Sequence, residues 1–284
     1  MGKTIAAWAA CALLLPGAAR AGSPPAGEKD ALVRVVTQWT ADCDGSKRTS
    51  WDDMVRAWYN DITDGHGAKN WDADGFYQNG SIVDSDFVDP DEVDFGNDFA
   101  NDRADEPDVM MIALHGGEAD DQRWFGRVRV NEAGDGNCNA YQGHVVLGDT
   151  DAEFLHLSSC HSMDDDVWWD EWGESFGGVH QIDGFAGIMW ISGSYTDRYE
   201  DFSDDAFDVP IAEAWYDNHY DSAFWPGEHD HCPVARGVGA SVNDLWNRMD
   251  HEEYDNVFSD PATDRDGVIW IEGCDPKDES PLPQ

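Results

Sequence analysis

One unbroken apolar run and one mostly apolar segment constrain the fold of this chain most. Residues 109–114 read VMMIAL and residues 152–157 read AEFLHL. Runs of this length are typical of strands buried on both faces, as in a parallel sheet with helices on either side. Helical spacing of apolar residues recurs elsewhere, and two shorter strands are expected. The expected helices cover 31–41, 51–62 and 211–220, and the shorter strands 124–130 and 268–271. The chain is therefore expected to be α/β, a three-layer sandwich with a mostly parallel central sheet flanked by helices.

The first 21 residues predict export. Lys3 precedes the apolar run at 5–15, Pro16 follows it, and Ala19-Arg20-Ala21 has the small-residue pattern of a cleavage site. The run is too short to cross a membrane and is typical of a secretory signal peptide. We expect cleavage near Ala21 and a secreted or periplasmic product. No later run approaches 18 apolar residues, so no membrane association is expected.

Composition divides the rest of the chain. Residues 22–104 are predicted to be an acidic elaboration of helices and loops, because 64–108 is rich in Asp, Asn and Gly. Residues 105–274 are predicted to form the α/β domain, and 275–284 a polar tail.

Charge excludes some partners. The chain has 59 acidic and 17 basic residues, a net charge of −42. Nucleic-acid binding and attraction to anionic membranes both need clustered Lys and Arg, so neither is expected. With 41% hydrophobic residues, the chain has ample material for a core. Dense carboxylates suggest a surface adapted to a saline or Ca²⁺-rich exterior.

Export changes the interpretation of the cysteines. Removal of Cys11 with the signal leaves five, an odd number that implies one free or intermolecular thiol. Four cysteines can form two disulfides in three pairings. The disulfide candidates are Cys43, Cys138, Cys232 and Cys274, with the pairing open.

Both apolar runs end at residues that can carry chemistry. The first run is followed by His115-Gly116-Gly117 and the second by Ser158-Ser159-Cys160. Ligands and catalytic groups gather at the carboxyl ends of strands in open α/β sheets. A Cys nucleophile needs a His to take its proton and backbone N–H donors to hold the oxyanion, and Gly116 permits a close approach of the main chain. His115 lies 45 residues before Cys160, close to the spacing of about 50 in caspase-type enzymes.

The order of strand, His-Gly, strand and Ser-Cys resembles the caspase-like cysteine peptidases, which include caspases, metacaspases, legumains and gingipains. Ser159-Cys160-His161-Ser162 is similar to the tetrapeptide around the metacaspase nucleophile, and 176–185 resembles a segment that forms a further core strand in related bacterial families. The resemblance spans roughly residues 105–260. It implies a caspase-like fold, a Cys160–His115 dyad, an oxyanion hole from the N–H groups of Gly116 and Cys160, and a peptide or protein substrate.

The chain departs from the metacaspase pattern near the expected substrate pocket. Ser158 stands where metacaspases have an Asp that helps to bind a basic P1 side chain. Asp164 and Asp165 are alternative sources of negative charge for that pocket.

Other clusters lead to alternative functions. His229 and His231 lie beside carboxylates and predict, as an alternative, a metal site of a hydrolase. Trp168, Trp169 and Trp172 among acidic residues suggest an exported binding protein on the same scaffold. No cofactor is required by the peptidase hypothesis. Ca²⁺ is a further candidate, although the loop that begins at Asn70 lacks the final Glu of an EF-hand.

Overall fold

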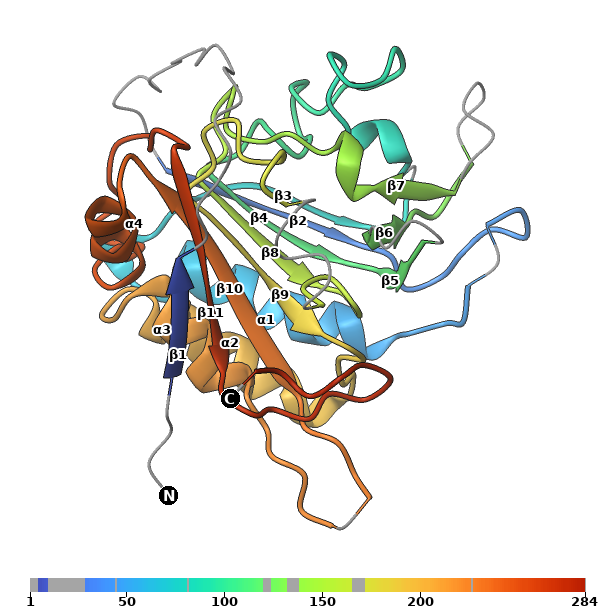
Figure 1. Ribbon diagram of the computed structural model, residues 1–284. Coiled ribbons are helices and arrows are strands. Elements are labelled where there is room, and N and C mark those ends of the chain that lie inside the picture. The colour runs from blue at the N-terminus through green and yellow to red at the C-terminus, as the bar shows by residue number, and fades with distance from the viewer. Residues whose placement is uncertain are drawn as a thin grey trace.

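The computed structural model describes residues 5–9, 29–43, 45–80, 82–119, 124–131, 138–164, 172–225 and 227–283. An eight-stranded sheet crosses the molecule in the order β1-β11-β10-β9-β8-β4-β2-β3 (Figure 1). Its strands are β1 (Ile5–Ala9), β2 (Asp30–Val35), β3 (Asp72–Gln78), β4 (Val109–Ala113), β8 (Phe154–Ser158), β9 (Gln181–Ala186), β10 (Cys232–Gly239) and β11 (Arg265–Ile271).

The sheet is parallel through β3, β2, β4, β8 and β9, and antiparallel from β9 through β10 and β11 to β1. The chain order reverses at β2, which pairs with β3 on one side and β4 on the other. Ligand sites of open α/β sheets lie beyond the carboxyl ends of strands near such a reversal. This mixed α/β architecture confirms the expected fold class.

Alternation along the buried strands builds a core on each face of the sheet. In β4, Met110 and Ile112 belong to one cluster, and Val109, Met111 and Ala113 belong to the other. Successive side chains of a strand point to opposite faces. An unbroken apolar run therefore fills both cores, which is why the run at 109–114 predicted its strand correctly.

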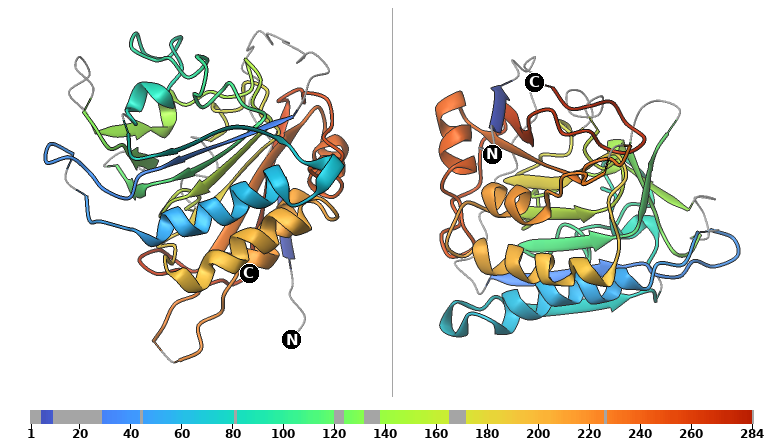
Figure 2. Two further views of the ribbon diagram at one scale, coloured as in Figure 1. Left: turned by 180° about the vertical axis from the view of Figure 1, so that it is seen from behind. Right: turned by 90° about the horizontal axis from the view of Figure 1, so that it is seen from below.

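One face of the sheet is covered by three helices, visible together in Figure 2. They are α1 (Ser50–Asp64), α2 (Thr196–Asp205) and α3 (Ile211–His219). Helix α1 presents Trp51, Val55, Trp58 and other apolar side chains at helical spacing, and these are fully buried. This confirms the helices expected at 51–62 and 211–220.

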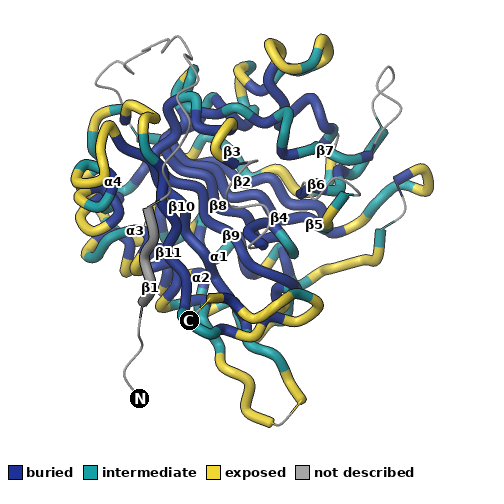
Figure 3. The backbone as a smooth tube through the Cα atoms, in the orientation of Figure 1, coloured by how far each residue is buried: buried dark blue, intermediate teal, exposed yellow. Residues whose placement is uncertain are grey.

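The opposite face is covered by a small antiparallel sheet, a long connection and α4 (Val242–Met249). The small sheet contains β5 (His115–Glu118), β6 (Trp124–Arg127) and β7 (Asn139–Tyr141). The connection between β3 and β4 has one 3₁₀ turn at Asp84–Asp86 within its described residues. The central strands are buried between these layers (Figure 3).

Some expectations for single elements were wrong. Residues 31–41 contain β2 rather than a helix, because 31–36 is fully apolar except for Arg34 and fills both faces of the sheet. Strands β2 and β3 place residues 30–35 and 72–78 in the central sheet, so the sheet extends across the boundary expected at residue 105. Strand β10 and helices α2 and α4 were not expected. Trp168 and Trp169 lie outside the described residues, whereas Trp172 is buried.

The backbone of Ile5–Ala9 forms β1 and pairs antiparallel with β11. These residues lie inside the predicted signal peptide, whose cleavage stays a prediction. Among the helices of the described residues, none combines the length and apolar character needed to cross a membrane.

Candidate functional site

Two neighbouring parallel strands place His115 and Cys160 in equivalent positions. Ala113 of β4 pairs with Ser158 of β8, and each functional residue follows two positions later. Paired residues of adjacent strands lie about 5 Å apart, and a step of two residues returns to the same face. The register therefore brings the imidazole and the thiol to one edge of the sheet.

Gly116 packs against the turn that carries Cys160. A Cβ at this position would overlap the carbonyl oxygen of Cys160 and the hydroxyl of Ser159. Nε1 of Trp124 donates to the same Cys160 carbonyl at 3.2 Å. Only glycine permits this contact, so the structure explains the Gly that follows His115. The oxyanion-hole role of the Gly116 and Cys160 N–H groups stays a prediction.

The His115 ring is held by two tryptophans and one backbone carbonyl. It stacks on Trp39 with ring centroids 4.4 Å apart, and Trp51 meets it edge-on at 5.3 Å. Nε2 lies 2.8 Å from the carbonyl oxygen of Ser46. A carbonyl only accepts, so Nε2 carries the proton and Nδ1 of the neutral ring keeps its lone pair.

Burial lowers the pKa of His115, and the positive charges of Arg48 and Arg127 lower it further. The hydrogen bond to Ser46 acts in the opposite direction and raises this pKa. The imidazole is therefore neutral at pH 7. A neutral ring with a free Nδ1 can accept a proton, as a general base must.

Cys160 is a free thiol of intermediate exposure at the edge of the helix-side core. Burial raises the pKa of this thiol, while a backbone hydrogen bond from Met189 and the charge of Arg48 act in the opposite direction. The resting thiol is consequently neutral. In the described part of the chain no hydrogen bond joins it to His115, whose polar partner is Ser46.

Two of the three predicted substrate-pocket residues are enclosed in the interior. Ser158 is fully buried, and its hydroxyl accepts from Nε1 of Trp51 at 3.1 Å and lies 2.6 Å from the Tyr199 hydroxyl. Asp164 is also fully buried; its carboxylate accepts from the Gly187 N–H at 2.5 Å and lies 2.7 Å from His161 Nδ1. Asp165 lies outside the described residues. Interior hydrogen bonding, not substrate binding, therefore accounts for Ser158 and Asp164.

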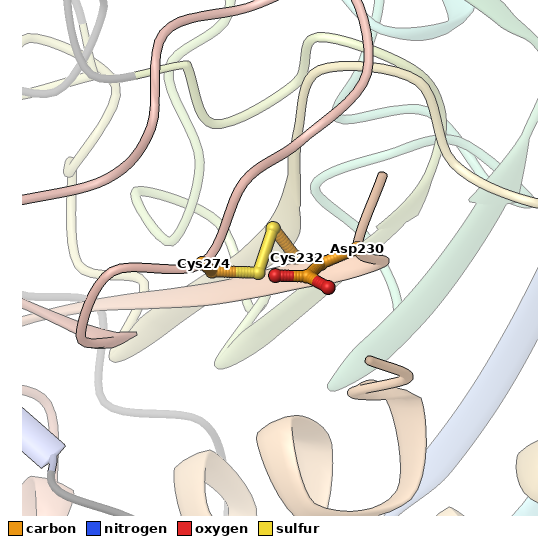
Figure 4. Close-up of side chains that lie close together, drawn as sticks. All are labelled: Asp230, Cys232 and Cys274. Carbon is orange, nitrogen blue, oxygen red and sulfur yellow. A yellow bond between two sulfur atoms is a disulfide. The ribbon is translucent and has the colours of Figure 1, made fainter. Parts of the chain in front are cut away.

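The disulfides answer the pairing question. Cys43 bonds Cys138, and Cys232 bonds Cys274, so Cys160 is the thiol left over. Figure 4 shows the second bridge beside Asp230. Asp230 and the two sulfurs meet the distances of a metal site, but sulfurs joined to each other are not thiolate ligands.

His229 and His231 do not form a metal site. His231 is buried and stacks on Phe185 at 4.4 Å, and burial lowers its pKa to about 3. His229 is on the surface, 3.6 Å from Asp275. In the described ranges three groups of three side chains have all their ligand atoms within 4.8 Å of one another, and neither histidine belongs to any of them.

Two further histidines have structural partners. His156 is fully buried between Asp183 and the Tyr254 hydroxyl, at 2.8 and 2.7 Å, as expected of a satisfied core histidine. His161 takes the left-handed conformation with φ of 56°, uncommon outside glycine, and this turns its ring toward Asp164.

Several residues around the site were missed from the sequence. They come from two loops: Trp39, Ser46 and Arg48 lie between β2 and α1, and Met189 follows β9. Their sequence gives no local signal, because their role depends on loops that the parallel sheet brings to the same edge. An aromatic or basic residue in a loop has many alternative roles.

Residues 37–272 match the model of a domain family of unknown function, DUF6345, and the chain therefore belongs to that family. The matched region includes His115 and Cys160 and extends from the loop after β2 to the end of β11. A comparison with curated proteins finds no match.

Proposed function

We propose that this DUF6345 protein is an exported caspase-like cysteine endopeptidase, with Cys160 as nucleophile and His115 as general base. The observation that carries the proposal is the equal register of the two residues, because each follows by two positions one member of the Ala113–Ser158 pair of the adjacent parallel strands β4 and β8. The free thiol, the neutral imidazole and the close approach of Gly116 support it. Export is supported by the predicted signal peptide and by two disulfides, which are typical of oxidising compartments.

The reaction follows from the resting charges of the two groups. Because thiol and imidazole are both neutral, proton transfer from Sγ to Nδ1 of His115 accompanies attack of sulfur on the scissile carbonyl carbon. The carbonyl oxygen gains the negative charge, which backbone N–H groups hold. Collapse breaks the C–N bond, and the amine leaves with the proton from His115. A water molecule, deprotonated by His115, then hydrolyses the thioester and restores the thiol.

The hydrogen bond from Nε2 to Ser46 has a role in this cycle. It fixes the tautomer, so that Nδ1 is always the proton acceptor, and it stabilises the imidazolium that forms. The stacked Trp39 and the edge of Trp51 restrict the ring to this orientation.

Local charge indicates the substrate. Asp164 is enclosed, whereas Arg48 is exposed and acts electrostatically on both Cys160 and His115. An exposed guanidinium beside the nucleophile suits a carboxylate of the substrate. We therefore expect an acidic P1 residue to be cleaved better than Arg or Lys.

The test is a panel of fluorogenic peptides with Asp, Asn, Arg or Lys at P1, incubated with the exported protein with and without Ca²⁺. Cleavage that is lost in Cys160→Ala and lowered at least about 100-fold in His115→Gln supports the peptidase. Equal hydrolysis by Cys160→Ala, or none above that control with any peptide, refutes it. Ligand binding that is indifferent to Cys160→Ala would instead favour the binding-protein alternative. Trp172, a residue of that alternative, is buried in the core, and its Nε1 donates a hydrogen bond to the Ser162 carbonyl oxygen.

A further inference from the structure

A histidine and two aspartates meet where helices α1 and α2 end. Asp61 lies in the last turn of α1, His66 in the segment that follows it, and Asp204 in the last turn of α2. Figure 2 shows α1 (blue) alongside α2 (gold). Each of the three side chains offers one ligand atom, and these atoms all lie within 4.8 Å of one another. The structure therefore brings together a nitrogen and two carboxylate oxygens from two helices.

Local contacts hold two of these side chains in place. Nε2 of His66 lies 2.8 Å from Oδ2 of Asp61. The imidazole ring stacks on Phe207 with centroids 3.8 Å apart, and the His66 N–H donates to Oδ1 of Asn70 at 2.7 Å. A Cβ on Gly65 would overlap Oδ1 of Asp61, so the glycine leaves room for the carboxylate. The histidine and the first aspartate are thus positioned by the fold itself.

Both helix ends lack a positive charge from Lys or Arg. The carboxyl end of a helix carries a partial negative charge and is stabilised by basic side chains. Neither α1 nor α2 has a Lys, Arg or His in its last turn, whereas α4 has Arg248 there. Among the ion pairs of the described residues, Asp61 pairs with His66, and Asp204 has no pair with Lys or Arg. Two negative helix ends and two carboxylates therefore converge on one place, which favours a dication.

A groove between α1 and α2 gives solvent access to the cluster. It has a volume of about 730 Å³ and is lined by residues of α1, including Asp61, and by residues within 193–200. Arg56 is the basic side chain among its described lining residues. This guanidinium pairs with Asp52 at 2.7 Å and lies over the ring of Phe76 at 3.7 Å. A hydrated cation can therefore reach Asp61, and water can complete its coordination.

We propose that Asp61, His66 and Asp204 bind one Zn²⁺ ion, with water as a further ligand. Bonds of Zn²⁺ to imidazole nitrogen and carboxylate oxygen are about 2.0–2.2 Å long, which places two ligands of one ion about 3–4 Å apart. The observed spacing, from 2.8 Å to at most 4.8 Å, brackets this range. Ca²⁺ and Mg²⁺ prefer oxygen ligands, so the imidazole favours Zn²⁺. The ion would replace the proton that His66 Nε2 and the Asp61 carboxylate share.

The ion has a structural role, because it ties the end of α1 to the end of α2. Trp51 at the start of α1 contacts His115, and the Tyr199 hydroxyl of α2 lies 2.6 Å from that of Ser158. Trp51 precedes Asp61 by ten residues, about 15 Å along the helix axis. Zn²⁺ would therefore steady two helices that support the candidate site without binding at it, and its presence does not depend on peptidase activity.

The experiment titrates ZnCl₂ into purified, chelator-treated protein without a histidine tag and follows the heat of binding and the melting temperature. NaCl at about 0.15 M and an excess of MgCl₂ suppress diffuse attraction to surface carboxylates. All proteins carry Cys160→Ala, because a thiol also binds Zn²⁺. We expect one Zn²⁺ per chain and a melting temperature that rises with Zn²⁺ concentration. His66→Gln should lower the affinity at least about 100-fold and Asp204→Asn at least about tenfold.

Three matched variants should keep both responses. Asp208→Asn removes a nearby exposed carboxylate, His251→Gln removes an exposed histidine, and Glu279→Gln alters another group of potential ligands. Because Asp204 is exposed, Asp204→Asn should melt with the wild type when Zn²⁺ is absent, so its loss of binding does not reflect unfolding. Unchanged binding in either site variant, loss of binding in Glu279→Gln, or absence of saturable binding overturns the proposed site.

Discussion

Burial shifts the pKa values of His115 and Cys160 in opposite directions, lowering the first and raising the second. Many cysteine nucleophiles are activated as thiolates, but both shifts here favour the uncharged pair. Arg48 is the charged side chain that influences both groups. Reactivity at this site is therefore expected to depend on a base that must stay deprotonated rather than on a preformed thiolate.

The first prediction concerns the pH dependence of cleavage. Catalysis needs neutral His115, and its folded pKa lies below the ordinary 6.5. Activity is therefore expected to be lost as pH falls through a value below 6.5. The measurement is kcat/KM of the best peptide substrate between pH 4.5 and 8. An acid limb centred above pH 6.5 would show that His115 is charged in the resting enzyme, against the proposed mechanism.

The second prediction concerns Arg48. Arg48→Gln removes a positive charge that lowers the pKa of both His115 and Cys160, so both pKa values rise. The acid limb should move to higher pH by less than about one unit, because an exposed charge is screened by water. Preference for Asp over Asn at P1 should fall as well. The control Lys277→Gln, which also removes an exposed cation, should change neither the acid limb nor the P1 preference. An unaltered P1 preference in Arg48→Gln would exclude Arg48 from substrate binding.

At the scale of elements, the two disulfides have different relations to the site. Cys43–Cys138 ties β7 to the loop between β2 and α1, and this loop contains Trp39, Ser46 and Arg48. Cys232–Cys274 joins the start of β10 to the segment after β11. Only the first bridge restrains residues that position His115.

We therefore expect the two bridges to be separable by activity. Cys43→Ser/Cys138→Ser should lower kcat/KM at least about tenfold at temperatures where the protein is still folded, since misplacement of a base by 1 Å can cost more. Cys232→Ser/Cys274→Ser should leave kcat/KM within about twofold. Each double variant is expected to lose about 2–5 kcal/mol of stability, measured by urea unfolding. Equal losses of activity in the two double variants would show that the loop between β2 and α1 has no special role in positioning His115.

Long apolar runs made the elements next to the site predictable. The run at 109–114 and the run at 152–157 predicted β4 and β8, and their final residues located His115 and Cys160. Strand β10 was missed because CPVARGVG carries Pro, Arg and two Gly, residues that are poor signals of a strand, although all eight positions are buried. Arg236 within it is fully buried and pairs with Asp266 of β11, a compensation that only the paired strands reveal.

The loops around the site were not predictable for a different reason. Ser46 acts through its backbone carbonyl, which any residue could supply, so its identity contains no signal. Trp39 and His115 are 76 positions apart. Their stacking depends on the parallel pairing of β2 with β4, which brings the segments after both strands to one edge.

At the scale of the whole molecule, the predicted export and the position of β1 can be tested together. Cleavage near Ala21 would remove β1, which lies at the edge of the sheet and pairs only with β11. Since β11 remains paired with β10, residues 22–284 should fold and melt within about 4 °C of the full-length chain. Amino-terminal sequencing of the exported protein should begin near Gly22. A product that retains Ile5 would contradict cleavage near Ala21.

The net charge of −42 makes a prediction for the whole molecule. Repulsion among surface carboxylates disfavours the compact state, and salt reduces it, because the screening length falls from about 10 Å at 0.1 M to about 3 Å at 1 M. The melting temperature should therefore rise as NaCl increases over this range. The measurement is the melting temperature in a NaCl series at constant pH, and a value that is flat between about 0.1 M and 1 M would contradict the saline adaptation.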